Sequence, residues 1–314
     1  MKPKIIFFGT PNFAVEILKE IYNGEFEIQA VVTSPDKKSG RGRKVNSSPV
    51  KNFCLEKKIK FYQPHSLKEE SFISIIKTYK SDIYVVVAFR MIPEIVWSIP
   101  KIGTFNLHAS LLPEYRGAAP INWVLINQES ITGLTTFIID NKIDSGKILL
   151  QSKYTIKEGE TYDTLHDNLL EIGKKLVFDT IQILFQKKYI SREQVINPKN
   201  KIAPKLTKSN TKIRWDNSLR EIVAFINGLN SYPGAWSFIS NNAKTDTFKI
   251  YDSDYEYISH EFTFNKLISY KKTLKIAHRE GFLIIKNLKI PNKKRMNTNE
   301  LLNGYTFEAG VFVS

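Results

Sequence analysis

Cysteine is almost missing from this chain of 314 residues, in which Cys54 is the single example. One cysteine cannot form an internal disulfide bond, so the sequence excludes a small secreted domain held together by disulfides. A reducing compartment suits such a chain better, and we expect a cytoplasmic protein.

Long hydrophobic runs are missing too. The longest strongly apolar stretches, such as residues 83–89, fall well short of the ~20 residues that a membrane-spanning helix needs. Residues 1–11 are too short for a signal peptide. The composition is 42% hydrophobic and 25% charged, which is typical of a globular protein. We therefore expect a folded protein with no membrane segment and with room for two domains.

Acidic side chains are scarce relative to basic ones. The chain has 46 Lys and Arg against 31 Asp and Glu, a net charge of +15. Such an excess favours a polyanionic partner such as nucleic acid, although nucleotide bias in a genome also enriches lysine. The excess is clustered: residues 34–60 hold nine basic and two acidic side chains, and residues 201–314 hold 18 and 10.

The first 190 residues alternate between strand and helix patterns. Residues 4–11 form an apolar run that ends at Gly9 and Pro11, as a strand buried on both faces does. A helix pattern and a second strand pattern complete a βαβ unit, and further segments continue the alternation: strands at 83–88, 103–107 and 135–139, and helices at 50–57, 71–79, 121–127 and 161–185. This order predicts an α/β domain, a doubly wound, Rossmann-like and mostly parallel sheet over residues 1–190.

A polar stretch at residues 191–204 has the composition of a linker between domains. Beyond it, one helix pattern at 218–227 is followed by short strand patterns separated by polar turns, at 235–239, 247–251, 273–277 and 281–288. Residues 205–314 are therefore predicted to form a smaller, mostly-β barrel of the OB type.

Asn106 and His108 are the first candidates for chemistry. They lie two residues apart on the predicted strand 103–107, so they point the same way at its carboxyl end, where open α/β sheets bind ligands. An imidazole can exchange a proton with an amine, and a carboxamide can donate a hydrogen bond to an oxyanion. Acyl transfer to nitrogen needs both functions, but an Asn-x-His pair alone also fits a structural histidine.

A second group of polar residues follows the strand pattern that ends near residue 139. It carries Asp140, Asp144 and Gly146. Asp144 could pair with His108, because a carboxylate near an imidazole fixes its orientation and favours its charged form. The spacing fits equally well a turn capped by an aspartate side chain.

Residues 34–51 are too long for a tight loop after a strand, for which about 2–6 residues suffice. They are rich in Gly, Ser and Lys. We interpret them as an insertion with a function, against the alternative of a solvated charged loop.

These segments together resemble the formyltransferases that use 10-formyltetrahydrofolate, and within them the branch that acts on methionyl-tRNA. The resemblance covers nearly the whole chain and is most specific in the run from Ser110-Leu111-Leu112-Pro113 through Tyr115-Arg116-Gly117 to Ile121. It also includes the following segments: Phe8-Gly9-Thr10-Pro11, residues 34–51, Gln63-Pro64, residues 86–89, 140–146, 204–207 and 213–215.

The resemblance implies Asn106, His108 and Asp144 as the catalytic residues and 10-formyltetrahydrofolate as co-substrate, with no metal. In the implied reaction an amine attacks the formyl carbon, Asn106 and His108 stabilise the oxyanion, and Asp144 orients His108. The implied folate contacts are Ser110, Leu111, Leu112 and Pro113, a wall formed by Val87, Phe89, Arg90 and Ile92, and Asp140 opposite.

The resemblance further implies initiator methionyl-tRNA as the acceptor, bound along its acceptor arm. Its phosphates would meet basic residues of the insertion and of the second domain: Arg41, Arg43, Lys44, Lys205, Lys208 and Arg214. We expect a monomer.

Two positions depart from the family pattern. Phe89-Arg90 replaces a common Tyr-Gly pair, so that Arg90 either reaches towards the anionic side of the folate or is solvated, and Lys142 replaces a common glycine. Two rival functions stay open. One is formyl transfer to an amino sugar nucleotide; the segments 205–207 and 213–215 argue against it. The other is a basic RNA-binding protein without activity; the presence of Asn106, His108 and Asp144 argues against it.

Overall fold

The computed structural model describes every residue except 1, 25, 40–43, 196, 242–243 and 309. The chain divides into two compact units. Unit 1 comprises residues 1–117, 132–154 and 167–202, and unit 2 comprises residues 118–131, 155–166 and 203–314.

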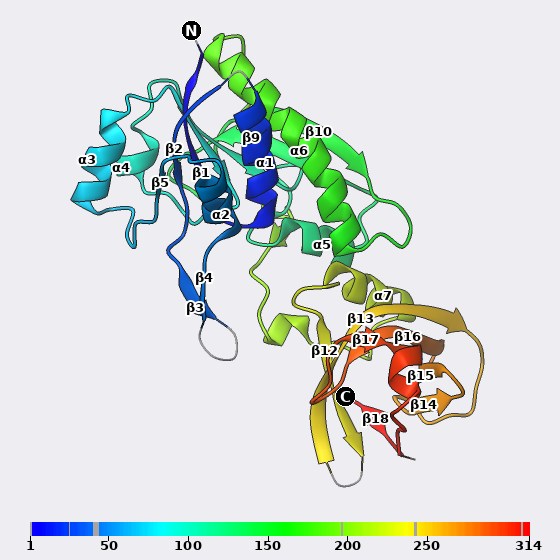
Figure 1. Cartoon of the computed structure of the whole chain (residues 1–314). Helices are drawn as coiled ribbons and strands as arrows, with labels where there is room; N and C mark the ends of the chain where they lie inside the picture. The colour runs from blue at the N-terminus through cyan, green and yellow to red at the C-terminus, as the bar shows by residue number, and fades with distance from the viewer. Residues whose placement is uncertain (1, 25, 40–43, 196, 242–243, 309) are drawn as a thin grey trace. The chain divides into compact units, whose positions relative to one another are not determined.

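Unit 1 is built on a seven-stranded sheet with the order β10-β9-β7-β6-β1-β2-β5 (Figure 1). Five neighbours in this order, β7 through β5, run parallel, and β9 pairs antiparallel with β7. The strands are β1 (Lys4–Gly9), β2 (Glu27–Val32), β5 (Phe61–Tyr62), β6 (Ile83–Val87), β7 (Gly103–His108), β9 (Ile131–Ile138) and β10 (Ile148–Thr155). The predicted doubly wound, mostly parallel α/β sheet is confirmed.

Helices cover both faces of this sheet because its central strands are apolar on both sides. On one face, Ile6 and Phe8 of β1 pack in a cluster with residues of α3 and α4. On the other face α6 approaches β7 and β9, where a Cβ added to Gly173 would lie 3.3 Å from both Leu107 and Leu134. The helices are α1 (Asn12–Asn23), α2 (Pro49–Glu56), α3 (Glu70–Thr78), α4 (Glu94–Trp97) and α6 (Tyr162–Phe185).

Unit 2 contains a curled antiparallel sheet of seven strands, β14-β15-β16-β13-β12-β18 with β17 beside β16. Its core includes Trp215, Phe248 and Ile276. The strands are β12 (Ala235–Asn241), β13 (Lys244–Tyr257), β14 (Leu267–Tyr270), β15 (Thr273–His278), β16 (Gly281–Lys289), β17 (Met296–Asn297) and β18 (Phe312–Val313). The predicted OB-like, mostly-β architecture of this region is confirmed.

Helix α7 (Leu219–Gly228) begins where its sequence signal places it. Ser218 accepts a hydrogen bond from the backbone of Glu221, and the Glu221 carboxylate returns to Ser218, which forms a capping box. The remaining short elements are β8 (Arg116–Gly117), α5 (Pro120–Ile126), β11 (Ile202–Ala203), a 3₁₀ turn (Ser209–Thr211) and α8 (Thr298–Leu302). None of the helices within the described ranges is long and apolar enough to cross a membrane.

The division into units departs from the predicted domain boundaries in three places, one of which is residues 155–166, expected with the first domain but belonging to unit 2. Helix α5, expected with the first domain, belongs to unit 2, where Asn122 donates a hydrogen bond of 2.7 Å to the Gly228 carbonyl. Residues 191–202, expected as a linker, belong to unit 1, where Arg192 pairs with Ile148. Where independently folding domains begin and end stays a prediction.

His278 is a buried polar residue of unit 2, 1% exposed, at the end of β15. Its Nε2 donates to the Asn217 carbonyl at 2.9 Å, and its Nδ1 accepts from the Glu280 amide at 3.2 Å. Burial lowers the pKa of His278, against smaller opposing effects of the Asn217 carbonyl and the Glu280 carboxylate. The folded chain therefore favours the neutral imidazole.

This arrangement predicts a loss of stability in acid. Above the ordinary histidine pKa of about 6.5 both states are neutral, but below it the unfolded chain takes up a proton that folded His278 resists. The free energy of unfolding is expected to fall as the pH drops from 7 towards 5, and to fall less steeply in His278→Gln. Denaturant titrations across this range provide the measurement. Equal pH dependence in the two proteins would contradict the assignment.

Candidate active site

His108 is the last residue of β7 and is 6% exposed. Its Nε2 lies 2.8 Å from the carbonyl oxygen of Tyr115. Because a carbonyl oxygen can only accept, Nε2 must carry the proton, and in the neutral imidazole Nδ1 keeps the free lone pair. Nδ1 is therefore the nitrogen available to exchange a proton.

Asp144 faces that nitrogen. Its Oδ2 lies 3.8 Å from His108 Nδ1 and accepts a hydrogen bond of 3.0 Å from the Gly117 amide. A separation of 3.8 Å is too long for a hydrogen bond but short enough for strong attraction to an imidazolium. The structure thus places Asp144 near His108. We expected Asp144 to orient the ring, but the hydrogen bond that orients it goes from Nε2 to the Tyr115 carbonyl.

Asn106 lies two residues before His108 on β7, with Val86 and Phe137 opposite it on the neighbouring strands. Two-residue spacing on a strand places the Asn106 and His108 side chains on the same face. Asn106 is half-buried, and no residue in the described part of the chain forms a hydrogen bond with its carboxamide. The carboxamide can therefore donate to a ligand on the face that also carries His108.

The loop that follows β9 has a shape that fixes Asp144. Asp140 Oδ1 accepts from the Lys142 amide at 3.0 Å and from the Ser145 hydroxyl at 2.7 Å, so this carboxylate closes the turn. A Cβ at Gly146 would lie 1.7 Å from the Ile138 carbonyl oxygen, which leaves glycine as the residue that fits.

The departure at Lys142 carries no backbone cost, because the positive φ in this loop, 51°, falls on Asp144. The loop was predicted either to be a turn capped by an aspartate or to pair a carboxylate with His108. Both occur, on different residues: Asp140 caps the turn, and Asp144 faces the imidazole.

Gln194 and Arg116 hold this loop, and neither role was predicted. Gln194 Nε2 donates to the carbonyls of Asp144 at 3.0 Å and Gly146 at 2.7 Å, and its Oε1 accepts from Arg116. Burial lowers the pKa of Arg116, while the nearby charges of Asp144 and Asp140 act in the opposite direction. Arg116 is part of the motif, but Gln194 lies in the predicted linker, where no sequence signal marks it.

The loop of Ser110 to Pro113, predicted to contact folate, is fixed by the neighbouring strands. The Thr135 hydroxyl donates to the Ser110 carbonyl at 2.7 Å and accepts from the Leu112 amide at 3.1 Å. Gln151 donates to the Leu112 carbonyl at 3.0 Å. The Ser110 hydroxyl is used within the loop, donating to the Glu114 carbonyl at 2.6 Å. Leu112 is buried against Phe137 and Ile148, so the partly exposed residues of the loop are Leu111 and Pro113, and its contact with folate stays a prediction.

The predicted folate wall begins at the end of β6. Val87 and Ile92 are buried, and Ala88 turns the chain with a φ of 46°. Apart from the regular strands and helices, no backbone hydrogen bond within the described residues involves residues 88–92. Their amides and carbonyls fit the hydrogen-bonding edge of a planar heterocycle such as a pterin.

Arg90 is exposed, and its guanidinium also binds the protein backbone. Its guanidinium donates to the carbonyls of Pro64 at 2.5 Å and His65 at 2.8 Å, and lies 5.7 Å from the centre of the Phe89 ring. Phe89 in turn contacts the Phe8 ring edge-on at 5.7 Å. Arg90 therefore ties the wall to the loop after β5, and a direct contact of Arg90 with folate stays a prediction.

The basic insertion contains a hairpin of β3 (Lys37–Ser39) and β4 (Lys44–Asn46). Arg41 and Arg43 lie outside the described residues, and Lys44 opens β4. The base of the hairpin is fixed by Asp36, which pairs with Lys51 at 2.5 Å and accepts from Gln63 at 2.8 Å. Hydrogen bonds from Gln63 and Lys51 lower the pKa of Asp36.

The basic residues predicted in unit 2 are exposed at its surface. Lys205 and Lys208 are both exposed, and the Lys208 ammonium lies 5.3 Å from the centre of the Trp236 ring. Arg214 is also exposed and pairs with Asp216 at 3.2 Å. Their contact with nucleic acid stays a prediction.

The geometry predicts the tautomer of His108. Nitrogen-15 NMR of the selectively labelled protein is expected to show protonated Nε2 and unprotonated Nδ1 when the ring is neutral, because the Tyr115 carbonyl accepts from Nε2. A dominant Nδ1–H form would show that Asp144 rather than Tyr115 orients the ring.

The chain matches two family models, the formyl transferase model over residues 3–181 and the formyl transferase C-terminal domain model over residues 205–306. Among its relatives, the methionyl-tRNA formyltransferase of Flavobacterium johnsoniae is 46% identical over 313 residues, covering 99% of each chain. That of Bacteroides thetaiotaomicron is 40% identical, over 98% of this chain and 97% of the relative.

Solved structures share the fold. An N-formyltransferase from Helicobacter canadensis, solved with folinic acid and dTDP-3-aminofucose, aligns with a TM-score of 0.63 at 23% identity, over 90% of this chain and 98% of that one. HypX from Aquifex aeolicus with tetrahydrofolic acid aligns at 0.67 and 15% identity, over 96% and 47%. With both units matched by formyl transferase models and relatives of that kind aligned over its whole length, the chain belongs to the formyl transferase family.

Proposed function

We propose that this protein transfers the formyl group of 10-formyltetrahydrofolate to the free amino group of methionine on initiator methionyl-tRNA. The observation that carries the proposal is the convergence of Asn106, His108 and Asp144, from two distant segments, at one edge of the sheet. The full-length similarity to methionyl-tRNA formyltransferases supports the choice of acceptor.

The residues on hand fit the chemistry that formyl transfer needs. 10-Formyltetrahydrofolate supplies an activated one-carbon group, so the protein has to position the amine, stabilise charge and move one proton. The new bond joins the amine nitrogen to the formyl carbon, the bond from that carbon to N10 breaks, and one proton passes from the amine to N10.

Each catalytic residue has a distinct task. The Asn106 carboxamide donates to the formyl oxygen as negative charge develops on it. His108 accepts the amine proton on Nδ1, since Nε2 is held by Tyr115, and then returns the proton to the leaving nitrogen. Asp144, 3.8 Å from Nδ1, stabilises the imidazolium that forms in between.

The acceptor is supported by charge as well as by similarity. Basic side chains are concentrated in the insertion at residues 34–60 and in residues 201–314. The base of the β3–β4 hairpin is held by the Asp36–Lys51 ion pair and by Gln63, so the described part of the insertion starts from a fixed point. Phosphates of a tRNA acceptor arm are the partners that such residues suit.

One assay tests the proposal. Purified protein is incubated with 10-formyltetrahydrofolate and either methionyl-tRNA or an amino sugar nucleotide, and N-formyl product is measured. We expect formylmethionyl-tRNA and no formylated sugar. A formylated sugar alone, or no product with either acceptor, would contradict the proposal.

The same assay tests the role of Asp144. Asp144→Asn keeps an oxygen for the Gly117 amide but removes the charge, and is expected to lower kcat by about a hundred-fold or more. The control Asp82→Asn changes an aspartate directly before β6, at the amino edge of the sheet, and is expected to leave kcat unchanged. Similar kcat values for the two variants would count against Asp144.

A further inference from the structure

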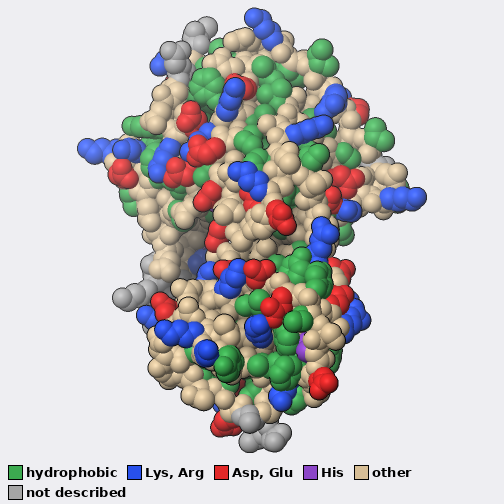
Figure 2. All heavy atoms as spheres, turned by 90° about the vertical axis from the view of Figure 1, so that its right-hand side faces the viewer, with side chains coloured by type: hydrophobic (Ala, Val, Ile, Leu, Met, Phe, Trp, Pro, Cys, Tyr) green, Lys and Arg blue, Asp and Glu red, His purple; other side chains and the backbone are tan. Residues whose placement is uncertain are grey.

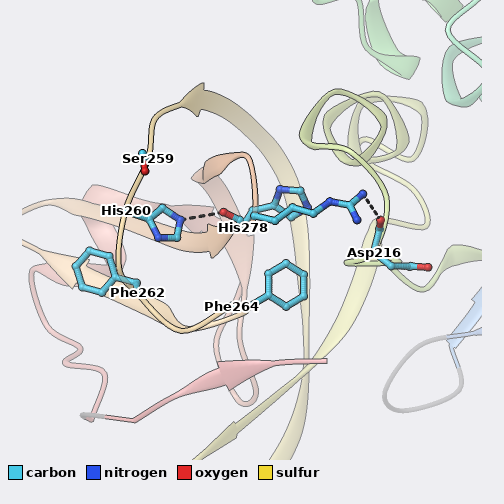
Figure 3. Close-up of a pocket in the computed structure, with 7 residues that line it drawn as sticks. Asp216, Ser259, His260, Phe262, Phe264 and His278 are labelled. Atoms are coloured by element: carbon cyan, nitrogen blue, oxygen red, sulfur yellow. Dashed lines mark hydrogen bonds between the residues drawn. The ribbon is translucent and has the colours of Figure 1, made fainter.

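Unit 2 contains a pocket of about 460 Å³ whose lining residues have no part in the proposed reaction (Figure 3). It lies between the loop that joins β13 to β14 and the turn that joins β15 to β16. Its lining residues are Asp216, Ser259, His260, Phe262, Phe264, His278 and Arg279.

Two phenylalanine rings, Phe262 and Phe264, give the pocket an aromatic lining. Phe262 is 47% exposed and Phe264 is 42% exposed, although both are large apolar side chains. Phe262 is supported by His260 and Phe282, with ring centres 5.9 and 5.8 Å away, and Phe264 is supported by His278 at 5.6 Å. The rings are therefore held in place by other rings while they stay accessible.

Apolar side chains are also exposed beside the pocket. Tyr257 and Ile258, which lead into the loop, are 62% and 55% exposed. Figure 2 shows hydrophobic side chains gathered on the face of unit 2 turned to the viewer. Clustered exposed apolar surface of this kind marks a binding site more often than chance exposure does.

His260 has a fixed orientation beside the pocket. Its Nε2 lies 2.9 Å from the carbonyls of both His278 and Gly281, so Nε2 carries the proton. Its Nδ1 is buried, so this nitrogen is closed to a ligand in the pocket. The His260 ring therefore supports Phe262 and Phe282 rather than binding a ligand through its nitrogen atoms.

Basic side chains lie beside these rings. Lys266 Nζ lies 5.9 Å from the Phe262 ring centre, and Lys275 Nζ, which is paired with Glu256 at 2.5 Å, lies 5.3 Å from that of Phe282. Arg279 lines the pocket, with one guanidinium nitrogen donating to the Asp216 carbonyl at 2.8 Å. Aromatic faces beside positive charges suit a planar ring attached to a phosphate backbone.

We propose that this pocket binds one unpaired base of the RNA acceptor, stacked on Phe262 and Phe264. Lys266, beside the Phe262 ring, meets the adjoining phosphate. This inference rests on the proposed function, since it assigns part of the tRNA to unit 2. Barrels of the OB type bind single-stranded nucleic acid by the same combination of aromatic stacking and positive charge.

The test compares Phe262→Ala and Phe264→Ala with Tyr270→Ala, a control at an aromatic residue of β14 that is 66% exposed and does not line the pocket. Both phenylalanine variants are expected to raise KM for methionyl-tRNA about five- to hundred-fold, as loss of one stacking contact does. Neither kcat nor KM for 10-formyltetrahydrofolate should change. Phe262→Trp should keep the native KM, whereas Phe262→Leu should not.

Salt dependence separates stacking from charge neutralisation. Binding of fluorescently labelled tRNA is measured at several salt concentrations. Phe262→Ala is expected to weaken binding by the same factor at every concentration, because stacking releases no counterions, and Lys266→Ala is expected to reduce the slope against salt.

The outcomes distinguish the two proposals. If the native protein forms no formylmethionyl-tRNA, the proposed function fails. If the native protein is active and both phenylalanine variants match Tyr270→Ala in KM and in binding, the RNA site is overturned, and this aromatic surface then belongs to a protein contact.

Discussion

The hydrogen bond from His108 Nε2 to the Tyr115 carbonyl is the contact on which the rest of the site depends. It joins the carboxyl end of β7 to the loop that follows it, and it fixes which ring nitrogen can exchange a proton. Two residues further along, the Gly117 amide donates to Asp144, which holds the loop after β9 close to the same imidazole. One loop thereby sets the position of both the base and its carboxylate.

The protein fixes this loop from several sides. Thr135 of β9 and Gln151 of β10 bind its beginning, and Glu114 receives hydrogen bonds from Asn200 and Lys201. A reactive group held by many separate contacts loses little freedom when substrate binds, which is how a protein lowers a barrier without further covalent chemistry. The segment after residue 190 thus contributes to the site rather than only connecting two parts of the chain.

The sequence predicts the framework of the site because that framework follows from local patterns. The apolar run of β6 predicts a buried parallel strand, and the two-residue spacing of Asn106 and His108 predicts a shared face. Pairing of Asp144 with His108 was one of two interpretations of the loop after residue 139, and the structure places the carboxylate 3.8 Å from the imidazole. The helix pattern at 218–227 likewise predicts α7.

The contacts that complete the site have no such pattern. Gln194 acts through two backbone carbonyls about fifty residues away in the chain, and Tyr115 acts through its own carbonyl, which any residue possesses. Arg90 binds two carbonyls of the loop after β5, and its charge alone does not identify these partners. The pocket of unit 2 could not be predicted from the sequence either, because Phe262 and Phe264 lie in a loop without a periodic pattern.

The central claim is that contacts made by residues other than Asn106, His108 and Asp144 hold the loops around His108 in position. Gln194→Ala tests it most directly, with Gln186→Ala as the control, since Gln186 is exposed directly after α6 and its side chain donates to Gln182. We expect Gln194→Ala to lower kcat for formyl transfer about ten- to hundred-fold with little change in KM for methionyl-tRNA, because Asp144 loses its alignment with His108. Equal kcat in the two variants would contradict the account.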